Sequence, residues 1–191
     1  MSNHTQRPHP GTADPRRKII DAALWLFAAK GYARTTVDSI AGRAKVSKGL
    51  IYYYFKGKGD ILKGIFSTLI AESEAMFEDR DQLSPQQFLK QISDYSFRFI
   101  LQETKLLRLT LALTVQPEVV KGLKNELEYV RKKWIGEMTR IFADLGYADP
   151  EAEVYLLCAL FDGVGLSYVS MPDYPIQDIQ HLIEKKYGLT S

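Results

Sequence analysis

The stretch T-T-V-D-S-I-A-G-R-A-K-V-S-K-G-L-I-Y-Y-Y-F-K-G-K, residues 35–58, holds two short helical patterns separated by a break. In the first pattern Ile40 and Ala41 fall on one apolar face, which is the core-facing side of an amphipathic helix. Thr35 is the predicted N-cap of this helix, and Asp38 stands three residues later, at the position of a capping-box partner. We therefore expect two short helices joined by a tight turn.

The second pattern places unusual side chains on the solvent side of a helix. Ser47 is a natural N-cap, and Ile51 and Phe55 lie one turn apart and mark the buried side. The opposite side presents a glycine, a leucine and two tyrosines: Gly49, Leu50, Tyr53 and Tyr54. Such a surface, flanked by lysines, is odd for a monomeric protein and suits a helix that lies in the major groove of DNA.

This segment resembles the DNA-binding domain of bacterial transcriptional regulators of the TetR type (TetR/AcrR). The matching pieces are L-F-A-A-K-G-Y (26–32), T-T-V-D-S-I-A (35–41), V-S-K-G-L-I-Y-Y-Y-F (46–55) and Lys58. Together they cover about residues 16–66 in the order and spacing of the family. The resemblance is therefore more specific than a generic helix-turn-helix pattern.

Two positions depart from the family pattern. Lys45 stands in the turn where the family usually has glycine, so this lysine is expected to adopt a positive φ at a cost of roughly 1 kcal/mol. Tyr54 stands where many relatives have histidine, so the base contacts of those relatives are not transferred to it.

The resemblance implies an all-α protein of about nine helices. Residues 14–58 would form an N-terminal three-helix helix-turn-helix domain, and residues 59–191 would form a helical regulatory domain for ligand binding and dimerisation. Residues 1–13 are polar and without periodicity, so they are predicted to be a disordered arm.

Cap residues predict where several helices begin. Asp14, Ser84 and Asp149 are each followed by proline, and this pair of residues is typical of a helix start. A further helix is expected at about residues 118–145, because apolar side chains recur there at helical spacing.

Nine residues of the helix-turn-helix segment are predicted to contact DNA. Thr36 should meet a phosphate at the start of the first short helix, and Tyr52 and Lys58 resemble phosphate contacts of the family. Gly49 would let the backbone approach closely, and Leu50 can touch a thymine methyl group. The predicted set is Thr36, Ser47, Lys48, Gly49, Leu50, Tyr52, Tyr53, Tyr54 and Lys58.

Charge is divided unevenly along the 191 residues, although the net charge is only +2. Residues 1–60 contain eleven Lys and Arg against four Asp and Glu, whereas residues 61–191 contain fourteen against nineteen. A basic part of this kind favours a nucleic-acid partner, and an ordinary solvated charge distribution is the simpler alternative. The motif within the basic part decides in favour of DNA.

Several classes of protein are not expected from the sequence. No run of 18 apolar residues occurs and the N-terminus has no apolar segment, so neither a membrane span nor a secretory signal is expected. Cys158 is the only cysteine, which excludes an internal disulfide and fits a reducing cytoplasm. Catalytic and metal-binding motifs are missing, so no enzyme, cofactor or metal is expected.

Small residues in an apolar stretch near the C-terminus suggest close helix packing. The stretch F-D-G-V-G-L, residues 161–166, lies in an expected helix at 151–170, where each glycine costs about 1 kcal/mol relative to alanine. It resembles the penultimate helix of the family, which forms a four-helix dimer interface with the last helix. The alternative is close packing within one subunit. The predicted interface residues are Phe161, Gly163, Val164, Gly165 and Tyr168.

Aromatic residues are dense in the middle of the chain. Most of them belong in a core, but the resemblance implies that the central helices enclose a cavity for a small inducer. Few charges lie on these apolar faces, so an apolar or aromatic ligand is expected. The predicted cavity residues are Tyr95, Phe99, Leu109, Trp134, Met138 and Phe161.

The sequence therefore favours a ligand-responsive, dimeric repressor that a small molecule releases from a near-palindromic operator in double-stranded DNA. Two other hypotheses remain at this stage. One is an all-α enzyme with a buried apolar site, and the other is a helical interaction protein without a DNA role. The segment at residues 35–58 and the uneven charge favour the repressor.

Overall fold

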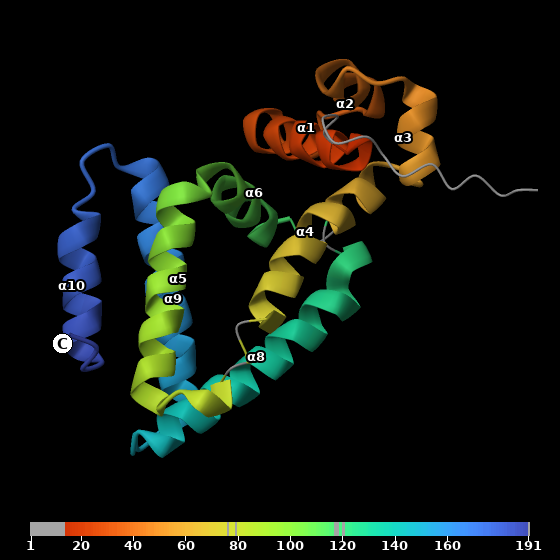
Figure 1. The fold of residues 1–191 in the computed structure, drawn as a ribbon. Helices are drawn as coiled ribbons and strands as arrows, with labels where there is room; N and C mark the ends of the chain where they lie inside the picture. Colours follow the sequence, from red (N-terminus) through yellow and green to blue (C-terminus); the bar gives the residue numbers. More distant parts are fainter. Residues whose placement is uncertain (1–13, 76, 79, 117–118, 120, 191) are drawn as a thin grey trace, which may run out of the picture. The chain divides into compact units, whose positions relative to one another are not determined.

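A computed structural model describes residues 14–190, with 76, 79, 117–118 and 120 left out. The expected arm at residues 1–13 lies outside the described residues. The predicted all-α fold is confirmed, because every regular element in the described part is helical (Figure 1). The α-helices are α1 (Pro15–Lys30), α2 (Val37–Ala44), α3 (Lys48–Tyr54), α4 (Lys58–Ala75), α5 (Pro85–Gln102), α6 (Thr104–Thr114), α8 (Lys124–Asp144), α9 (Pro150–Ser170) and α10 (Ile176–Lys186).

The chain divides into two compact units, Met1–Ile65 and Phe66–Ser191. The division falls inside α4, whereas the predicted boundary follows Lys58. The N-terminal unit thus contains α1, α2, α3 and the first part of α4. The C-terminal unit contains the rest of α4 and the remaining helices.

Local caps define the helices of the N-terminal unit. The Asp14 carboxylate accepts a hydrogen bond from the backbone N–H of Arg16 at 3.0 Å, and Pro15 occupies the first turn of α1, as predicted. Gly31 ends α1 with a φ of 82°, which favours glycine. The helices then close over a core in which Phe27 and Ile40 are almost fully buried.

The predicted cap of α2 is wrong by one residue. Thr36 is the N-cap: its hydroxyl accepts from the backbone N–H of Ser39 at 3.1 Å, and the Ser39 hydroxyl accepts from the Thr36 N–H at 3.1 Å. Thr35 is buried instead, and its hydroxyl donates to the carbonyl of Gly31 at 2.9 Å. Thr35 therefore joins the end of α1 to the start of α2, and Asp38 has no part in the capping box.

The turn between α2 and α3 follows the predicted geometry. Lys45 has a φ of 56°, in the left-handed region expected where the family has glycine. The backbone N–H of Val46 donates to the carbonyl of Ala41 at 3.1 Å, so the end of α2 is satisfied despite the strained lysine. The Ser47 hydroxyl then caps α3 by accepting from the Leu50 N–H at 3.1 Å, as predicted.

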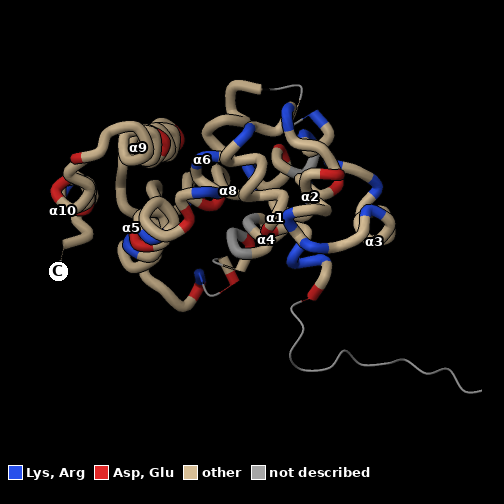
Figure 2. Tube along the Cα trace, turned by 90° about the horizontal axis from the view of Figure 1, so that it is seen from above, with Lys and Arg blue, Asp and Glu red and all other residues tan. Residues whose placement is uncertain are grey.

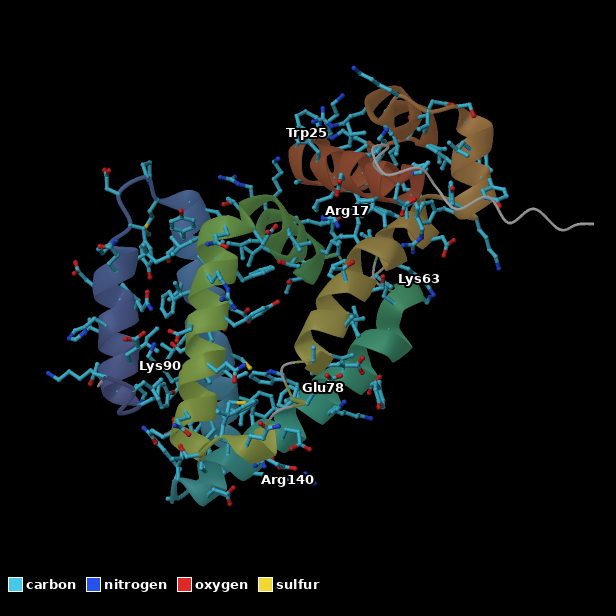
Figure 3. The ribbon with its side chains drawn as sticks, viewed as in Figure 1. Arg17, Trp25, Lys63, Glu78, Lys90 and Arg140 are labelled. Atoms are coloured by element: carbon cyan, nitrogen blue, oxygen red, sulfur yellow. The ribbon has the colours of Figure 1, made fainter. Side chains whose placement is uncertain are left out.

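The C-terminal unit is a packed helical domain in which α5, α9 and α10 run side by side, as Figure 1 shows. Ser84 and Gln87 form the capping box of α5, and the Asp149 carboxylate caps α9. Lys90 on α5 projects toward α10, where its ammonium lies 3.5 Å from the carboxylate of Glu184 (Figure 3). The hydrophobic core of this unit includes Phe88 and Phe142.

The helix predicted at about residues 118–145 is shorter than expected. A 3₁₀ turn at Lys121–Leu123 precedes it, and α8 begins only at Lys124. Glu118 lies outside the described residues. The sequence signal was weak there because Gly122 stands inside the apolar pattern, and glycine lowers helix propensity.

Candidate nucleic-acid interface and ligand cavity

Helix α3 exposes one face of the N-terminal unit to solvent. Ile51 and Phe55 are 0% and 3% exposed, so they fix the helix against the core. On the other side Tyr53 is 80% exposed and Tyr52 is 52% exposed. The predicted DNA residues are distributed accordingly: Thr36, Ser47, Lys48, Gly49, Tyr52 and Tyr53 are exposed, and Leu50, Tyr54 and Lys58 are half-buried.

Gly49 is not required by packing within the unit. A Cβ atom built on it would meet only the Ser47 hydroxyl, at the ordinary contact distance of 3.9 Å. Its φ also lies outside the left-handed region. The missing side chain therefore matters only for a molecule that approaches α3 from outside.

The two tyrosines at the end of α3 support each other. The rings of Tyr53 and Tyr54 meet edge to face, with centroids 4.9 Å apart and planes at 87°. Aromatic pairs favour this arrangement, and it restricts the rotation of an otherwise exposed ring. Tyr53 is thus presented to solvent in a defined orientation.

Lys48 is joined to the preceding helix by an ion pair. Its ammonium lies 2.8 Å from the carboxylate of Asp38, and both side chains are largely exposed. The hydrogen bond that the Lys48 ammonium donates to the Asp38 carboxylate raises the pKa of Lys48 above its ordinary value. Lys48 is therefore positively charged near neutral pH, but part of its field is compensated by the carboxylate.

Lys58 has a structural role that the sequence did not suggest. Its ammonium donates to the carbonyls of Tyr32 at 2.8 Å and Ala33 at 3.3 Å. It also lies 4.3 Å from the centroid of the Tyr32 ring, and burial lowers the pKa of Lys58. The residue predicted to touch a phosphate thus also fastens the start of α4 to the connection between α1 and α2.

Further basic residues surround α2 and α3, as Figure 2 shows for the first helices and their connections. The side chains of Arg34, Arg43, Lys45 and Lys56 are exposed. The Arg43 guanidinium is held over the ring of Trp25, 3.5 Å from its centroid. This fixed cation adds to a positive surface of the kind that binds phosphates.

The C-terminal unit contains a cavity of about 190 Å³ between α5, α6 and α9. Three of the six predicted ligand residues line it, namely Tyr95, Phe99 and Phe161. The other lining residues are Ser96, Ile100, Leu107, Thr110, Leu111, Thr114 and Asp162. The prediction included Leu109 of α6, which is buried in the core, and missed the four α6 residues that line the cavity, although these recur at helical spacing.

The other three predicted ligand residues lie elsewhere. Met138 is fully buried in the core of the unit, and Trp134 packs against that core. Leu109 is 1% exposed and does not line the cavity. These three residues do not line this cavity, and packing within the unit accounts for their apolar character.

Asp162 and Cys158 lie on the flank of α9. Asp162 is at the exposed edge of the cavity, and its partial desolvation raises its pKa. Burial and the neighbouring Asp162 carboxylate raise the pKa of the Cys158 thiol to about 11. A thiol of this kind is almost fully protonated at neutral pH and is therefore a poor nucleophile.

The two glycines of α9 face different surroundings. A Cβ atom on Gly165 would lie 3.0 Å from Leu107 Cδ1, so Gly165 lets α6 approach within the same subunit. Val164 is also buried inside the unit. For these two residues the alternative of packing within one subunit is correct. Gly163 is exposed, and a Cβ atom there would meet nothing within 4 Å.

An apolar surface remains open on α9 and α10. Leu156, Leu166 and Leu182 are 42%, 55% and 59% exposed. By length and composition alone α9 could cross a membrane, and only 22% of its apolar window is buried. The helix is part of a packed domain, so its open side needs another explanation. Of the remaining predicted interface residues, Phe161 and Tyr168 pack against the core of the unit.

Comparisons with known proteins agree with this fold. Residues 19–65 match the sequence profile of "Bacterial regulatory proteins, tetR family". The transcriptional regulator SrpR of Pseudomonas putida is 40% identical over 55 residues, which are 29% of this chain and only 26% of SrpR. The uncharacterized regulator YhgD of Bacillus subtilis is 27% identical over 158 residues, which cover 78% of this chain and 81% of YhgD.

Solved structures share the whole architecture. The transcriptional regulator FadR of Bacillus subtilis, in complex with stearoyl-CoA, superposes with a TM-score of 0.73 at 22% identity. The match covers 90% of this chain and 96% of that protein. The profile match assigns residues 19–65 to the tetR family of bacterial regulatory proteins, and the described chain as a whole shares the helical fold of FadR.

Proposed function

We propose that this protein is a cytoplasmic transcriptional regulator, and specifically a dimeric repressor that a small molecule releases from its operator. The observation that carries the proposal is the exposed face of α3. It shows Gly49 and two tyrosines to solvent, although nothing within the unit requires them there. Basic side chains on both flanks suit a phosphate backbone. An all-α enzyme or an interaction protein would have no use for this combination.

In this proposal α3 enters the major groove. Gly49 lets the backbone come close to the bases, and Leu50 contacts a thymine methyl group. Tyr53 meets base edges from the end of the helix, in the orientation set by Tyr54. Thr36, Ser47, Lys48, Tyr52 and Lys58 contact the phosphates and fix the position of α3 on the duplex.

A second copy of the chain covers the open side of α9 and α10. Gly163 allows the two α9 helices to approach, and the exposed leucines of both helices provide apolar area. Two α3 helices then read half-sites about 34–36 Å apart, or a multiple of that distance. The operator is consequently near-palindromic.

The cavity between α5, α6 and α9 holds the inducer. FadR was solved with stearoyl-CoA, so a protein of this fold holds a ligand with a long apolar chain. The cavity of about 190 Å³ suits a smaller molecule. A ligand acts only if it prefers one conformation, and a coupling of about 1–3 kcal/mol would weaken DNA binding roughly 5–150-fold.

The test begins with selection of an operator from random duplexes, followed by fluorescence anisotropy over a range of salt concentrations. Tyr53→Ala should lower operator affinity by about 10–100-fold, because a base contact of this kind contributes about 1–3 kcal/mol. Tyr129→Ala is the matched control, since Tyr129 is 63% exposed on α8. Equal operator affinity for both variants, or no selected sequence at all, would refute the proposal.

A further inference from the structure

The size of the cavity between α5, α6 and α9 limits its ligand. Its volume of about 190 Å³ is little more than that of an engineered cavity of about 150 Å³ that holds one benzene molecule. A single aromatic ring with a few additional heavy atoms fits this space. A long chain or a fused ring system does not, unless the helices move apart.

The cavity wall carries negative charge, which comes from one carboxylate. Among the ten described residues that line the cavity, Asp162 is charged and no other is. Within the described part of the chain no basic side chain forms an ion pair with Asp162. Its carboxylate has lost part of its hydration at the cavity edge, and no cation of the protein replaces the lost water.

Aromatic rings form much of the remaining wall. Tyr95 and Phe99 lie one turn apart on α5, with their rings nearly parallel at 19° and centroids 6.5 Å apart. Phe161 contributes a third ring from α9. The Arg98 guanidinium already lies 5.7 Å from the centroid of Tyr95, so this ring accepts a cation on one of its faces.

We propose that the cavity binds a small organic cation with one aromatic ring, whose positive head lies at Asp162 and whose ring lies among Tyr95, Phe99 and Phe161. This inference rests on the proposed function, because it names the chemical class of the inducer. A neutral aromatic molecule would leave the partly desolvated carboxylate without a counterion. An anionic molecule would be repelled by the same carboxylate.

The first measurement is isothermal titration calorimetry of the full-length protein without DNA, with three ligands of similar shape. Benzyltrimethylammonium is the cation, neopentylbenzene is its neutral isostere and phenylacetate is the anion. We expect benzyltrimethylammonium to bind at up to millimolar concentration and phenylacetate to bind at least about tenfold more weakly, a difference of about 1.4 kcal/mol. No binding of the cation, or tighter binding of the anion, would overturn the proposal.

The second measurement separates charge from shape. Asp162→Asn should weaken binding of the cation about three- to tenfold and leave the neutral isostere within about twofold. Asp162→Glu keeps the charge and should retain most of the affinity. Asp173→Asn is the control, because Asp173 is exposed in the connection between α9 and α10 and does not line the cavity. An equal loss for cation and isostere, or no loss for either, would contradict the role of Asp162.

The third measurement distinguishes this inference from the proposed function. The same protein is titrated with its selected operator in the presence and absence of benzyltrimethylammonium. Release of the operator by the cation supports both the cation site and the proposed function. Binding of the cation without release supports the site and contradicts its role as the inducer site. A protein that binds the cation and no DNA supports the site and refutes the proposed function.

Discussion

Helices α3 and α9 both expose side chains that a surface helix usually lacks, but their surroundings differ. Around α3 the exposed tyrosines stand among lysines and arginines, and α3 belongs to a unit rich in positive charge. Around α9 the exposed large apolar side chains are Tyr155, Leu156 and Leu166, and Gly163 leaves the backbone accessible. The difference indicates two kinds of partner: a polyanion for α3, and a second apolar helix pair for α9.

The two units also differ in what fixes their helices. In the N-terminal unit short-range hydrogen bonds at Asp14, Thr36 and Ser47 set the starts of α1, α2 and α3. In the C-terminal unit caps are found at Ser84 and Asp149, but which face of each helix turns inward is decided by packing between distant segments. The family profile follows the same division, because it matches residues 19–65, within the N-terminal unit.

The largest expected effect concerns the open side of α9. Gly163→Arg should convert the dimer into a monomer and lower operator affinity by about 100-fold or more, since one subunit reads only one half-site. A Cβ atom at Gly163 would meet nothing within 4 Å, and Gly is about 1 kcal/mol less favourable than Ala in a helix. The subunit itself should therefore remain folded. Analytical ultracentrifugation at micromolar concentration measures the change.

The matched control for this variant is Gly136→Arg. Gly136 lies in α8, is exposed, and a Cβ atom built on it would meet nothing within 4 Å. The substitution Gly136→Arg therefore introduces the same charge at another exposed glycine. Gly165→Arg is not a useful comparison, because it would collide with Leu107 inside the subunit. A wild-type protein that sediments as a monomer, or a Gly163→Arg variant that remains a dimer, would contradict the proposal that the open side of α9 binds a second copy of the chain.

Much of the N-terminal unit follows from local sequence signals. The positive φ of Lys45, the cap at Ser47 and the buried pair Ile51 and Phe55 depend on residues a few positions apart, and all were predicted correctly. The error at α2 is instructive, because two adjacent threonines can each cap a helix. Only the burial of Thr35 against the end of α1 selects Thr36, and a local pattern does not contain that information.

The candidate ligand cavity was predicted only in part, for a physical reason. Apolar and aromatic residues line cavities and fill cores alike, so composition did not separate Phe161 from Met138. Likewise a glycine in a helix indicates that another segment packs closely against it, but the sequence does not say which segment. A Cβ atom on Gly165 would contact Leu107 of the same chain, whereas a Cβ atom on Gly163 would meet nothing within 4 Å. These distinctions depend on long-range packing.

A smaller effect is expected at Lys58, which tests whether a residue of the DNA surface also stabilises its own unit. An ammonium has three donors, two of which serve the carbonyls of Tyr32 and Ala33, so one can reach a phosphate. Lys58→Ala should lower the free energy of unfolding by about 1–3 kcal/mol and reduce the salt slope of DNA binding by about one. Denaturant unfolding and salt-dependent anisotropy measure the two quantities.

Lys56→Ala is the control for Lys58→Ala. Its side chain is exposed, and the substitution leaves the backbone N–H of Lys56 free to donate to Asp60 as before. It should therefore change the stability by much less than Lys58→Ala. If Lys58→Ala changes the stability alone, Lys58 is a positioning residue without a phosphate contact. If it changes the slope alone, the two carbonyl contacts contribute little to folding.

The smallest expected effect concerns the ion pair between Lys48 and Asp38. The carboxylate lies 2.8 Å from the ammonium and compensates part of the positive charge beside α3. Asp38→Asn should release this charge and raise DNA affinity about two- to fivefold at low salt, and the gain should disappear at high salt because exposed charges are screened. Asp21→Asn changes the net charge of the same unit equally from α1, where Asp21 is exposed. Equal gains in DNA affinity for Asp38→Asn and Asp21→Asn would show that only the net charge of the unit affects DNA binding. A gain confined to Asp38→Asn, and lost when Lys48→Ala is added, would show that the carboxylate of Asp38 limits how strongly Lys48 binds phosphate.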